Sequence, residues 1–263
     1  MANGASGDLC KTSIYWNSDR YISADRRMTV TMRSHGPRRE RMEDNVAYHM
    51  TTIEQAVVIA LFGLRSRNAL ACFGVNLPGY KLANPEIVSR REEHAVFERS
   101  ICDYVPLYWV CRTPMQWART MSDWNRVSNE DLVFFVFNVG RLTTLPRVVT
   151  TDGNAACKET RFWHGWGAWE HLHWEALNYD GPCGDDYKRW KQAEILVLDE
   201  IPASFIQAIN VYTESAKKRL IDAIKTVVGN VESTEVTREI FAHLQNDYNF
   251  DVIVDPKKYF VQS

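Results

Sequence analysis

The chain has 263 residues and a formal net charge of -2, and 45% of its residues are hydrophobic and 24% charged. Such a composition is typical of a globular protein that is long enough to bury one sizeable core. No apolar run approaches the roughly 20 residues of a membrane helix, and the first residues carry no signal pattern, so we expect a cytoplasmic protein without a membrane partner.

Residues 1–44 form a predicted basic N-terminal extension, followed by a predicted domain at 45–263. The segment 20–41 contains seven arginines, opposed only by Asp25 and Glu40. Such a stretch can follow a phosphate backbone, and it can equally be a solvated arm. Both interpretations stand at this point.

The first half of the domain mixes strand and helix patterns. In chain order we expect a strand at 45–51, a helix at 52–64, a turn-rich stretch at 66–85, a helix at 86–97, and strands at 104–111 and 131–139. Thr52 can cap the first helix and Gly63 lies near its end. The two later strands are predicted from their β-branched and aromatic residues.

The second half is less regular. We expect an irregular, tryptophan-rich stretch at 140–187, a strand at 193–198, a helical turn and strand at 202–212, helices at 213–230 and 233–245, and a strand at 249–256. Thr213 can cap the helix at 213–230, and Gly229 can end it. There is no regular βαβ rhythm, no GxGxxG after a strand and no GxxxxGK[ST] motif, so an α+β fold is predicted rather than a doubly wound one.

Glu194 interrupts the most apolar strand of the chain. On a pleated strand it shares a face with Leu196 and Leu198. A carboxylate in such a setting is costly unless it is paired, lies at a cleft or changes its protonation. The functional interpretation is a carboxylate held in a cleft, and the alternative is a glutamate that faces water on an edge strand.

Two further positions have alternative interpretations. Arg91 follows Arg90 and precedes two glutamates, a pattern that fits a solvated helix face but also a guanidinium that clamps a diphosphate. His49 precedes a helix and is either a structural histidine or, with Thr51, a ligand contact.

The remaining polar clusters are less specific. The three histidines between 164 and 173 lack metal-binding spacing, and the six cysteines contain no CxxC, so neither a metal site nor a disulfide framework is predicted. The tryptophans between 163 and 174 can stack on bases or pack in the core. Lys188, Arg189 and Lys191 precede Glu194 and either protect the start of the strand or bring an anionic polymer to it.

Several stretches, in their order and spacing, resemble DarT-type ADP-ribosyltransferases. They are "YHMT", "GLRSRNAL", "EIVSRR", "DYVPLYWVCRTPMQW", "TDGNAA" and "KQAEILV". "DYVPLYW" followed by "RTPM" and "KQAEILV" is specific as a combination, although each motif alone is weak. The resemblance covers about 45–212 and leaves residues 1–44 outside it.

The resemblance implies an ADP-ribosyltransferase fold, with two small antiparallel sheets packed face to face around an NAD cleft and helices at the flanks. It implies an enzyme that consumes NAD, without a metal, and transfers ADP-ribose to a nucleobase in single-stranded DNA. It further implies a toxin of a toxin–antitoxin or phage-defence system, with an antitoxin partner such as a DarG macrodomain protein.

The resemblance also implies roles for individual residues. Glu194 is expected to be the catalytic glutamate and Arg91 a catalytic arginine that clamps NAD. The expected NAD contacts are His49, Thr51, Gly63, Leu64, Arg91 and Tyr104. Asn154 is expected in the substrate loop. From their positive charge, the expected phosphate contacts of the nucleic acid are Arg67, Arg112, Lys188, Arg189 and Lys191.

The sequence departs from the family pattern at the acceptor side. Asn154 stands where some members have histidine, and "MQW" replaces the usual "ML" plus an aromatic residue. Messenger RNA or a protein therefore remains an alternative acceptor. A catalytically silent nucleic-acid-binding module is the alternative from a different class.

Overall fold

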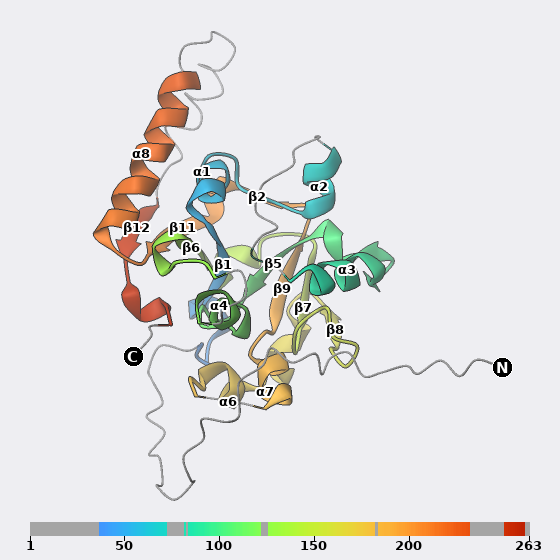
Figure 1. The fold of residues 1–263 in the computed structure, drawn as a ribbon. Helices are drawn as coiled ribbons and strands as arrows, with labels where there is room; N and C mark the ends of the chain where they lie inside the picture. The colour runs from blue at the N-terminus through green and yellow to red at the C-terminus, as the bar shows by residue number, and fades with distance from the viewer. Residues whose placement is uncertain are drawn as a thin grey trace, which may run out of the picture.

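The computed structural model describes residues 37–72, 82, 84–121, 126–181, 184–231 and 250–260. Its centre is one eight-stranded sheet (Figure 1). In their order across the sheet, the strands are β12 (Asp251–Val254), β11 (Ile206–Val211), β6 (Leu132–Asn138), β1 (Val46–Thr52), β5 (Tyr104–Tyr108), β9 (Glu194–Leu198), β7 (Val148–Thr151) and β8 (Phe162–His164).

Two short strand pairs and several helices surround this sheet. The pairs are β2 (Leu64–Arg65) with β10 (Glu200–Ile201) and β3 (Ala95–Val96) with β4 (Arg99–Ser100). The α-helices are α1 (Ile53–Phe62), α2 (Arg67–Cys72), α3 (Pro85–Glu93), α4 (Pro114–Thr120), α5 (Val139–Leu142), α6 (Trp174–Asn178), α7 (Asp185–Trp190) and α8 (Glu214–Val231). Short 3-10 turns are η3 (Met42–Asp44), η5 (Ile101–Asp103), η6 (Asn129–Asp131), η7 (Gly167–His171), η8 (Ala203–Phe205) and η9 (Pro256–Lys258).

The α+β class is confirmed, but the expectation of two small antiparallel sheets is wrong. The eight strands form one sheet, and β12 runs parallel to β11. The reason lies at the middle of the sheet, where β1 pairs with β6 along its whole length but with β5 only through Tyr48 and Tyr108. This one pair joins two four-stranded halves into a continuous sheet.

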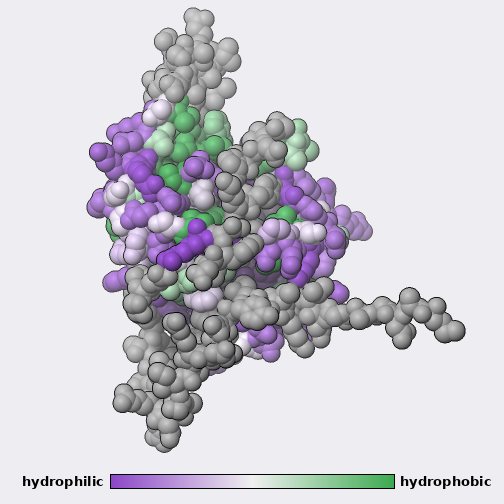
Figure 2. Space-filling model, viewed as in Figure 1, coloured by the Kyte–Doolittle hydropathy of each residue, from purple (hydrophilic) through white to green (hydrophobic). Residues whose placement is uncertain are grey.

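One face of the sheet carries the main core. The apolar helix α1 and the inner side of α8 pack there, with Ala60 and Leu220 fully buried. Figure 2 shows a mostly hydrophilic outer surface in this view, with apolar residues gathered beside α1 and α8. The opposite face carries two smaller clusters, one around Phe134 and Tyr259 and one around Leu196.

Most predicted elements are confirmed with small shifts of their ends. Gly63 ends α1 with a φ of 79°, and Thr213 caps α8 by accepting a hydrogen bond of 3.2 Å from the Ala216 N–H. Thr52 occupies the cap position of α1 but makes no side-chain cap bond. Gly229 does not end α8, which continues to Val231.

Three predicted stretches differ from the structure, and other predictions concern undescribed residues. The stretch 66–85 is not turns throughout, because α2 lies in it. The stretch 140–187 is not irregular, because β7, β8 and α6 lie in it and α7 begins in it. The helix predicted at 86–97 ends at Glu93, and the β3–β4 hairpin follows. The helix predicted at 233–245 and the part of the basic extension up to residue 36 lie outside the described residues.

The described end of the extension packs on the domain. Nδ2 of Asn45 donates to the carbonyl of Arg38 at 2.9 Å and to that of Arg41 at 2.8 Å. Within the described ranges, no helix is long and apolar enough to cross a membrane. Cys72, Cys102, Cys111 and Cys157 are free thiols.

Candidate active site

Glu194, the first residue of β9, lies in a row of side chains that crosses one face of the sheet. Its partner on β5 is Tyr108, whose partner on β1 is Tyr48. Directly paired residues of neighbouring antiparallel strands project to the same face, with the strands about 4.8 Å apart. The three side chains therefore form one row in an otherwise apolar part of the sheet.

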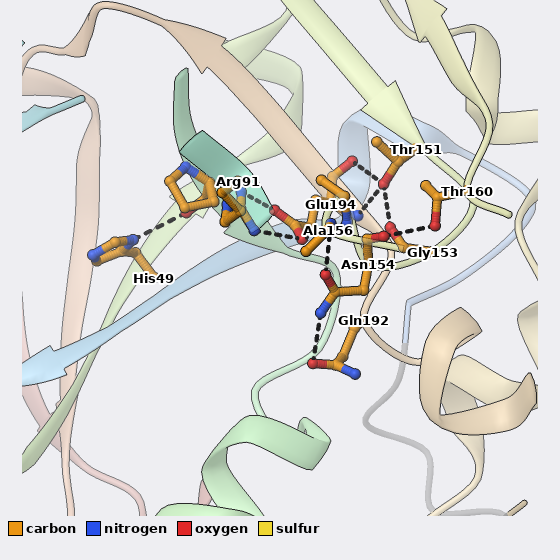
Figure 3. A network of polar contacts seen from close by, with 11 residues as sticks. His49, Arg91, Thr151, Gly153, Asn154, Ala156, Thr160, Gln192 and Glu194 are labelled. Carbon is orange, nitrogen blue, oxygen red and sulfur yellow. Dashed lines mark hydrogen bonds and ion pairs between the residues drawn. The ribbon is translucent and has the colours of Figure 1, made fainter. Parts of the chain in front are cut away.

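The carboxylate of Glu194 is fully buried and accepts three hydrogen bonds (Figure 3). Arg91 donates from Nη1 to Oε1 at 3.1 Å and from Nη2 to Oε2 at 2.8 Å. The backbone N–H of Ala155 donates to Oε1 at 3.0 Å. These bonds explain how an apolar strand tolerates a glutamate, because the charge is paired and its oxygens are hydrogen-bonded.

Arg91 reaches this carboxylate from the last turn of α3. The helix begins at Pro85, and the side chain of Asn84 caps it by accepting from the Glu86 N–H at 2.9 Å. Only 15% of the Arg91 side chain is exposed. Burial acts to lower the pKa of Arg91, but the adjacent Glu194 carboxylate outweighs it and raises that pKa above its usual range. The guanidinium is therefore a permanent cation at this site.

The loop that follows β7 holds Glu194 from the other side. The N–H of Glu194 donates to Oγ1 of Thr151 at 2.8 Å, and Thr151 donates to the carbonyl of Gly153 at 2.6 Å. Asn154 is buried; its Nδ2 donates to Oε1 of Gln192 at 3.0 Å, and its Oδ1 accepts from the Ala156 N–H at 2.9 Å. Both ends of the Asn154 amide are thus used inside the protein, and its contact with nucleic acid stays a prediction.

His49 lies on the other side of the Arg91–Glu194 pair from this loop (Figure 3). Its Nδ1 is 3.0 Å from the carbonyl oxygen of Pro106, which can only accept a hydrogen bond. Burial lowers the pKa of His49, and the bond to Pro106 opposes this shift only in part. The ring is therefore neutral at pH 7, with the proton on Nδ1 and an acceptor at Nε2.

Thr51 is almost fully buried, and its hydroxyl donates to the side chain of Gln55 in the first turn of α1. The expected NAD contact of Thr51 therefore has to use the remaining acceptor capacity of that hydroxyl. This contact stays a prediction.

Three predicted NAD contacts lie toward the other end of β9. Tyr104 is paired with Leu198, and Leu64 is paired with Ile201 just beyond. A strand rises about 3.3 Å per residue, so this end is about 13 Å from Glu194 along the strand. A Cβ on Gly63 would lie 2.4 Å from the carbonyl oxygen of Ile201. The glycine is therefore required by close packing, and its NAD contact stays a prediction.

The five predicted phosphate contacts all pair with carboxylates. Arg67 pairs with Glu92, Arg112 with Asp180 at 3.3 Å, Lys188 with Asp185 at 3.0 Å, Arg189 with Asp152 at 3.6 Å, and Lys191 with Asp180 at 3.3 Å. Lys191 is only 5% exposed, and its ammonium also donates to the carbonyl of Tyr179. Phosphate contacts by these residues stay predictions, since a phosphate has to compete with these carboxylates.

Sequence reasoning missed several residues of the site. Tyr108 could have been found, because the strand alternation of "DYVPLYW" places it on the face of Tyr104. Gln192 and Thr151 act through hydrogen bonds that only the folded chain creates. Ala155 acts through its backbone N–H, which no residue type signals.

A glutamate held on a strand and paired with an arginine, in a mixed α+β fold, fits the ADP-ribosyltransferase class that the sequence resembles. The family described as "ssDNA thymidine ADP-ribosyltransferase, DarT" matches residues 48–242. The chain belongs to this family. It is an ADP-ribosyltransferase with NAD as its co-substrate, which confirms the prediction. Among the described residues, no group of three or more His, Cys, Asp or Glu could hold a metal ion.

Several solved structures have a similar fold. Thermus sp. 2.9 DarT in complex with ADP-ribosylated ssDNA has a TM-score of 0.64 and 22% identity, covering 83% of this chain and 97% of that one. Thermosipho africanus DarTG in complex with ADP-ribose has a TM-score of 0.62 and 22% identity, covering 82% of this chain and 51% of that one. Thermus sp. 2.9 DarT in complex with NAD+ has a TM-score of 0.59 and 21% identity, covering 83% and 98%. No curated protein matches the chain.

Proposed function

We propose that this chain transfers ADP-ribose from NAD to a thymidine base in single-stranded DNA, with Glu194 as the catalytic carboxylate. The observation that carries the proposal is the fully buried Glu194, fixed by Arg91 and by the Ala155 N–H. The description of the chain's family names this reaction. A rigid, hydrogen-bonded carboxylate is what a reaction with a developing positive charge requires.

The reaction breaks the bond between C1′ of a ribose and the nicotinamide nitrogen, and nicotinamide leaves as a neutral molecule. C1′ then resembles an oxocarbenium ion, whose charge a nearby carboxylate stabilises. Oε1 of Glu194 already accepts two hydrogen bonds and Oε2 only one. Because each carboxylate oxygen has two lone pairs, Oε2 keeps an acceptor position for the 2′-hydroxyl of that ribose.

The acceptor atom follows from the chemistry of thymidine. N1 of the base is bonded to deoxyribose, so N3 is the ring nitrogen that carries a proton. A bond forms between C1′ and N3, and the N3 proton passes to Glu194 or to a water that it holds. The base must leave any stack to reach a buried carboxylate, which favours a single-stranded substrate.

The neighbouring residues orient the two substrates in this proposal. Arg91 holds Glu194 in place, and its remaining N–H groups are available to an NAD phosphate. Nε2 of neutral His49 accepts a hydrogen bond from the nicotinamide carboxamide. NAD extends along β9 from the Glu194 end toward Tyr104 and Leu64. Asn154 and its loop border the base.

Radiolabelled NAD, incubated with single-stranded DNA, single-stranded RNA and total cell protein, tests this function. Label on DNA is expected, and Glu194→Ala should remove it while NAD still binds. Label on RNA or on protein alone would refute the DNA assignment and retain the NAD chemistry. If NAD is not consumed with any acceptor, the silent binding module replaces the enzyme.

We further propose that the chain is a toxin with a cognate antitoxin of the macrodomain type. This rests on family membership and on similarity to a DarTG structure. Expression of the chain alone should arrest growth, and expression of Glu194→Ala should not. Growth arrest by both proteins would show that the toxicity is unrelated to the transfer reaction.

A further inference from the structure

The turn of the β3–β4 hairpin has an unusual sequence for its shape. Its two central residues are Phe97 and Glu98, with φ angles of 48° and 66°. Two-residue hairpin turns with positive φ at both positions favour asparagine, aspartate and glycine, because a bulky side chain is disfavoured in the left-handed region. A phenylalanine here costs free energy, and such strain often accompanies a functional position.

The ring of Phe97 is also unusually open to solvent. It is 42% exposed, and its centroid lies 3.5 Å from that of His164, with 21° between the two ring planes. His164 belongs to β8 at the edge of the sheet. The turn therefore holds one face of the Phe97 ring against an imidazole and leaves ring surface accessible to a planar partner.

This ring pair lies on the same face of the sheet as the catalytic carboxylate. His164 is paired with Val149 on β7, and Val149 is paired with Leu196 on β9. Leu196 is two residues from Glu194 and projects to the same side. Val96, next to Phe97, packs with Val149 and Leu196 in one cluster. The hairpin is thus anchored at Leu196, two residues from Glu194 along β9.

Charges of both signs flank the ring: Glu98 in the turn is exposed, and Arg99 supplies a cation that a phosphate can meet. Arg99 on β4 is exposed, and among the residues that the structure describes it makes no salt bridge. Exposed aromatic rings next to cations are the usual means of binding single strands, because every base has a π-face and every linkage carries a phosphate. An aliphatic protein partner would not require a ring held parallel to a second ring.

We propose that Phe97, backed by His164, stacks on a base that flanks the modified thymidine in the single-stranded substrate. This proposal rests on the proposed function. In it, Phe97 touches the substrate outside the reacting centre and determines how the strand is positioned. The base at that place is held by stacking, so its identity matters less than its presence.

The test compares three variants on a single-stranded oligonucleotide that the wild-type enzyme ADP-ribosylates. Phe97→Asn removes the ring but suits the left-handed turn, Phe97→Trp keeps a ring, and Phe62→Asn removes a similarly exposed ring from the end of α1. Phe97→Asn should raise KM for the oligonucleotide about 10-fold and leave KM for NAD unchanged. Phe97→Trp should keep KM for the oligonucleotide near that of the wild type, and Phe62→Asn should leave both KM values unchanged.

A double-mutant cycle then identifies the base. Abasic sites are placed singly on either side of the target thymidine. One of these sites should raise KM for the wild type and have no further effect on Phe97→Asn. Such coupling is specific for a contact and would not arise from a general loss of structure.

Two outcomes would overturn the proposal. If Phe97→Asn raises KM for NAD and not for the oligonucleotide, the ring stacks on the adenine of NAD. If neither constant changes, the ring has no role in binding. A wild-type enzyme that does not label single-stranded DNA would instead reject the proposed function, so the two failures are distinguishable.

Discussion

Arg91 and Glu194 are 103 residues apart in sequence, yet two parallel hydrogen bonds of 3.1 and 2.8 Å join the guanidinium to the carboxylate. The side chains are only 15% and 0% exposed. The pair connects α3 to β9, so it fixes both the position of the carboxylate and the helix that borders it. Removing either partner leaves a charge with little access to water.

Arg91→Ala should therefore destabilise the fold as well as stop the reaction. Loss of one partner of a buried ion pair typically costs about 3–5 kcal/mol. Arg91→Lys keeps the charge but loses the second parallel bond, so it should recover part of the stability and little of the activity. Urea unfolding and the rate of NAD consumption measure the two effects.

A surface pair supplies the control. Arg219 and Asp131 also form an ion pair, but their side chains are 47% and 49% exposed. Arg219→Ala should cost at most about 1 kcal/mol. If Arg91→Ala is as mild as this control, the carboxylate is not held by Arg91 in solution.

Asn154→Ala tests whether this residue positions the loop or reads the base. The substitution leaves Oε1 of Gln192 and the Ala156 N–H without their partner, which should cost about 1–3 kcal/mol. We expect lower kcat for both ADP-ribose transfer and NAD hydrolysis without DNA, because the loop carries the Ala155 N–H that bonds to Glu194.

Thr160→Val is the matched control for this prediction. The Thr160 hydroxyl donates to the Asn154 carbonyl at 2.6 Å, so its loss loosens the same loop without changing the Asn154 side chain. A smaller loss of both activities is expected. If Asn154→Ala impairs only transfer to DNA and Thr160→Val impairs nothing, Asn154 contacts the base directly.

The parts of the fold that the sequence predicts are those with a strong local pattern. The apolar strands β6 and β9 and the helix α8 were expected near their observed bounds. The strand β7 was missed because it is short and half of it is threonine. The turn at Phe97 and Glu98 was missed because neither residue type signals a turn.

The candidate site divides in a similar way. Glu194 conflicts with its apolar strand, so the conflict itself indicates function. The pairing of Arg91 with Glu194 joins distant parts of the chain. The local sequence around Arg91 therefore does not reveal it, and is compatible with both a diphosphate clamp and a solvated helix face. The single sheet also depends on a tertiary contact, the pair between Tyr48 and Tyr108.

His49 should make the stability of the protein fall as the solution becomes acidic. Burial lowers the pKa of His49 in the folded protein below the usual value of 6.5. Below that value the unfolded chain binds a proton that the folded chain does not, so stability is lost as the pH falls. His49→Asn should make the free energy of unfolding depend less on pH between about pH 7.5 and about pH 5.5.

His49→Asn preserves the hydrogen bond to Pro106, because an asparagine N–H can donate to the Pro106 carbonyl as Nδ1 of His49 does. Urea unfolding at several pH values gives the comparison between the wild type and the variant. An unchanged pH dependence would mean that His49 takes up its proton as readily in the folded chain as in the unfolded one.

Gly63→Ala distinguishes a structural glycine from an NAD contact. Its φ of 79° disfavours any side chain, and the new Cβ would lie 2.4 Å from the carbonyl oxygen of Ile201. The strain alone costs about 1–3 kcal/mol, and the contact adds to it because the opposing atom belongs to the backbone.

We expect a clear fall in the unfolding midpoint of Gly63→Ala, with KM for NAD unchanged in the folded fraction. Gly184→Ala, where a Cβ meets nothing within 4 Å, should cost less than about 1 kcal/mol. If Gly63→Ala instead raises KM for NAD and keeps the stability of the wild type, Gly63 is an NAD contact and not a packing requirement. Gly63 would then approach the dinucleotide, and β10 would have to move to admit the new methyl group.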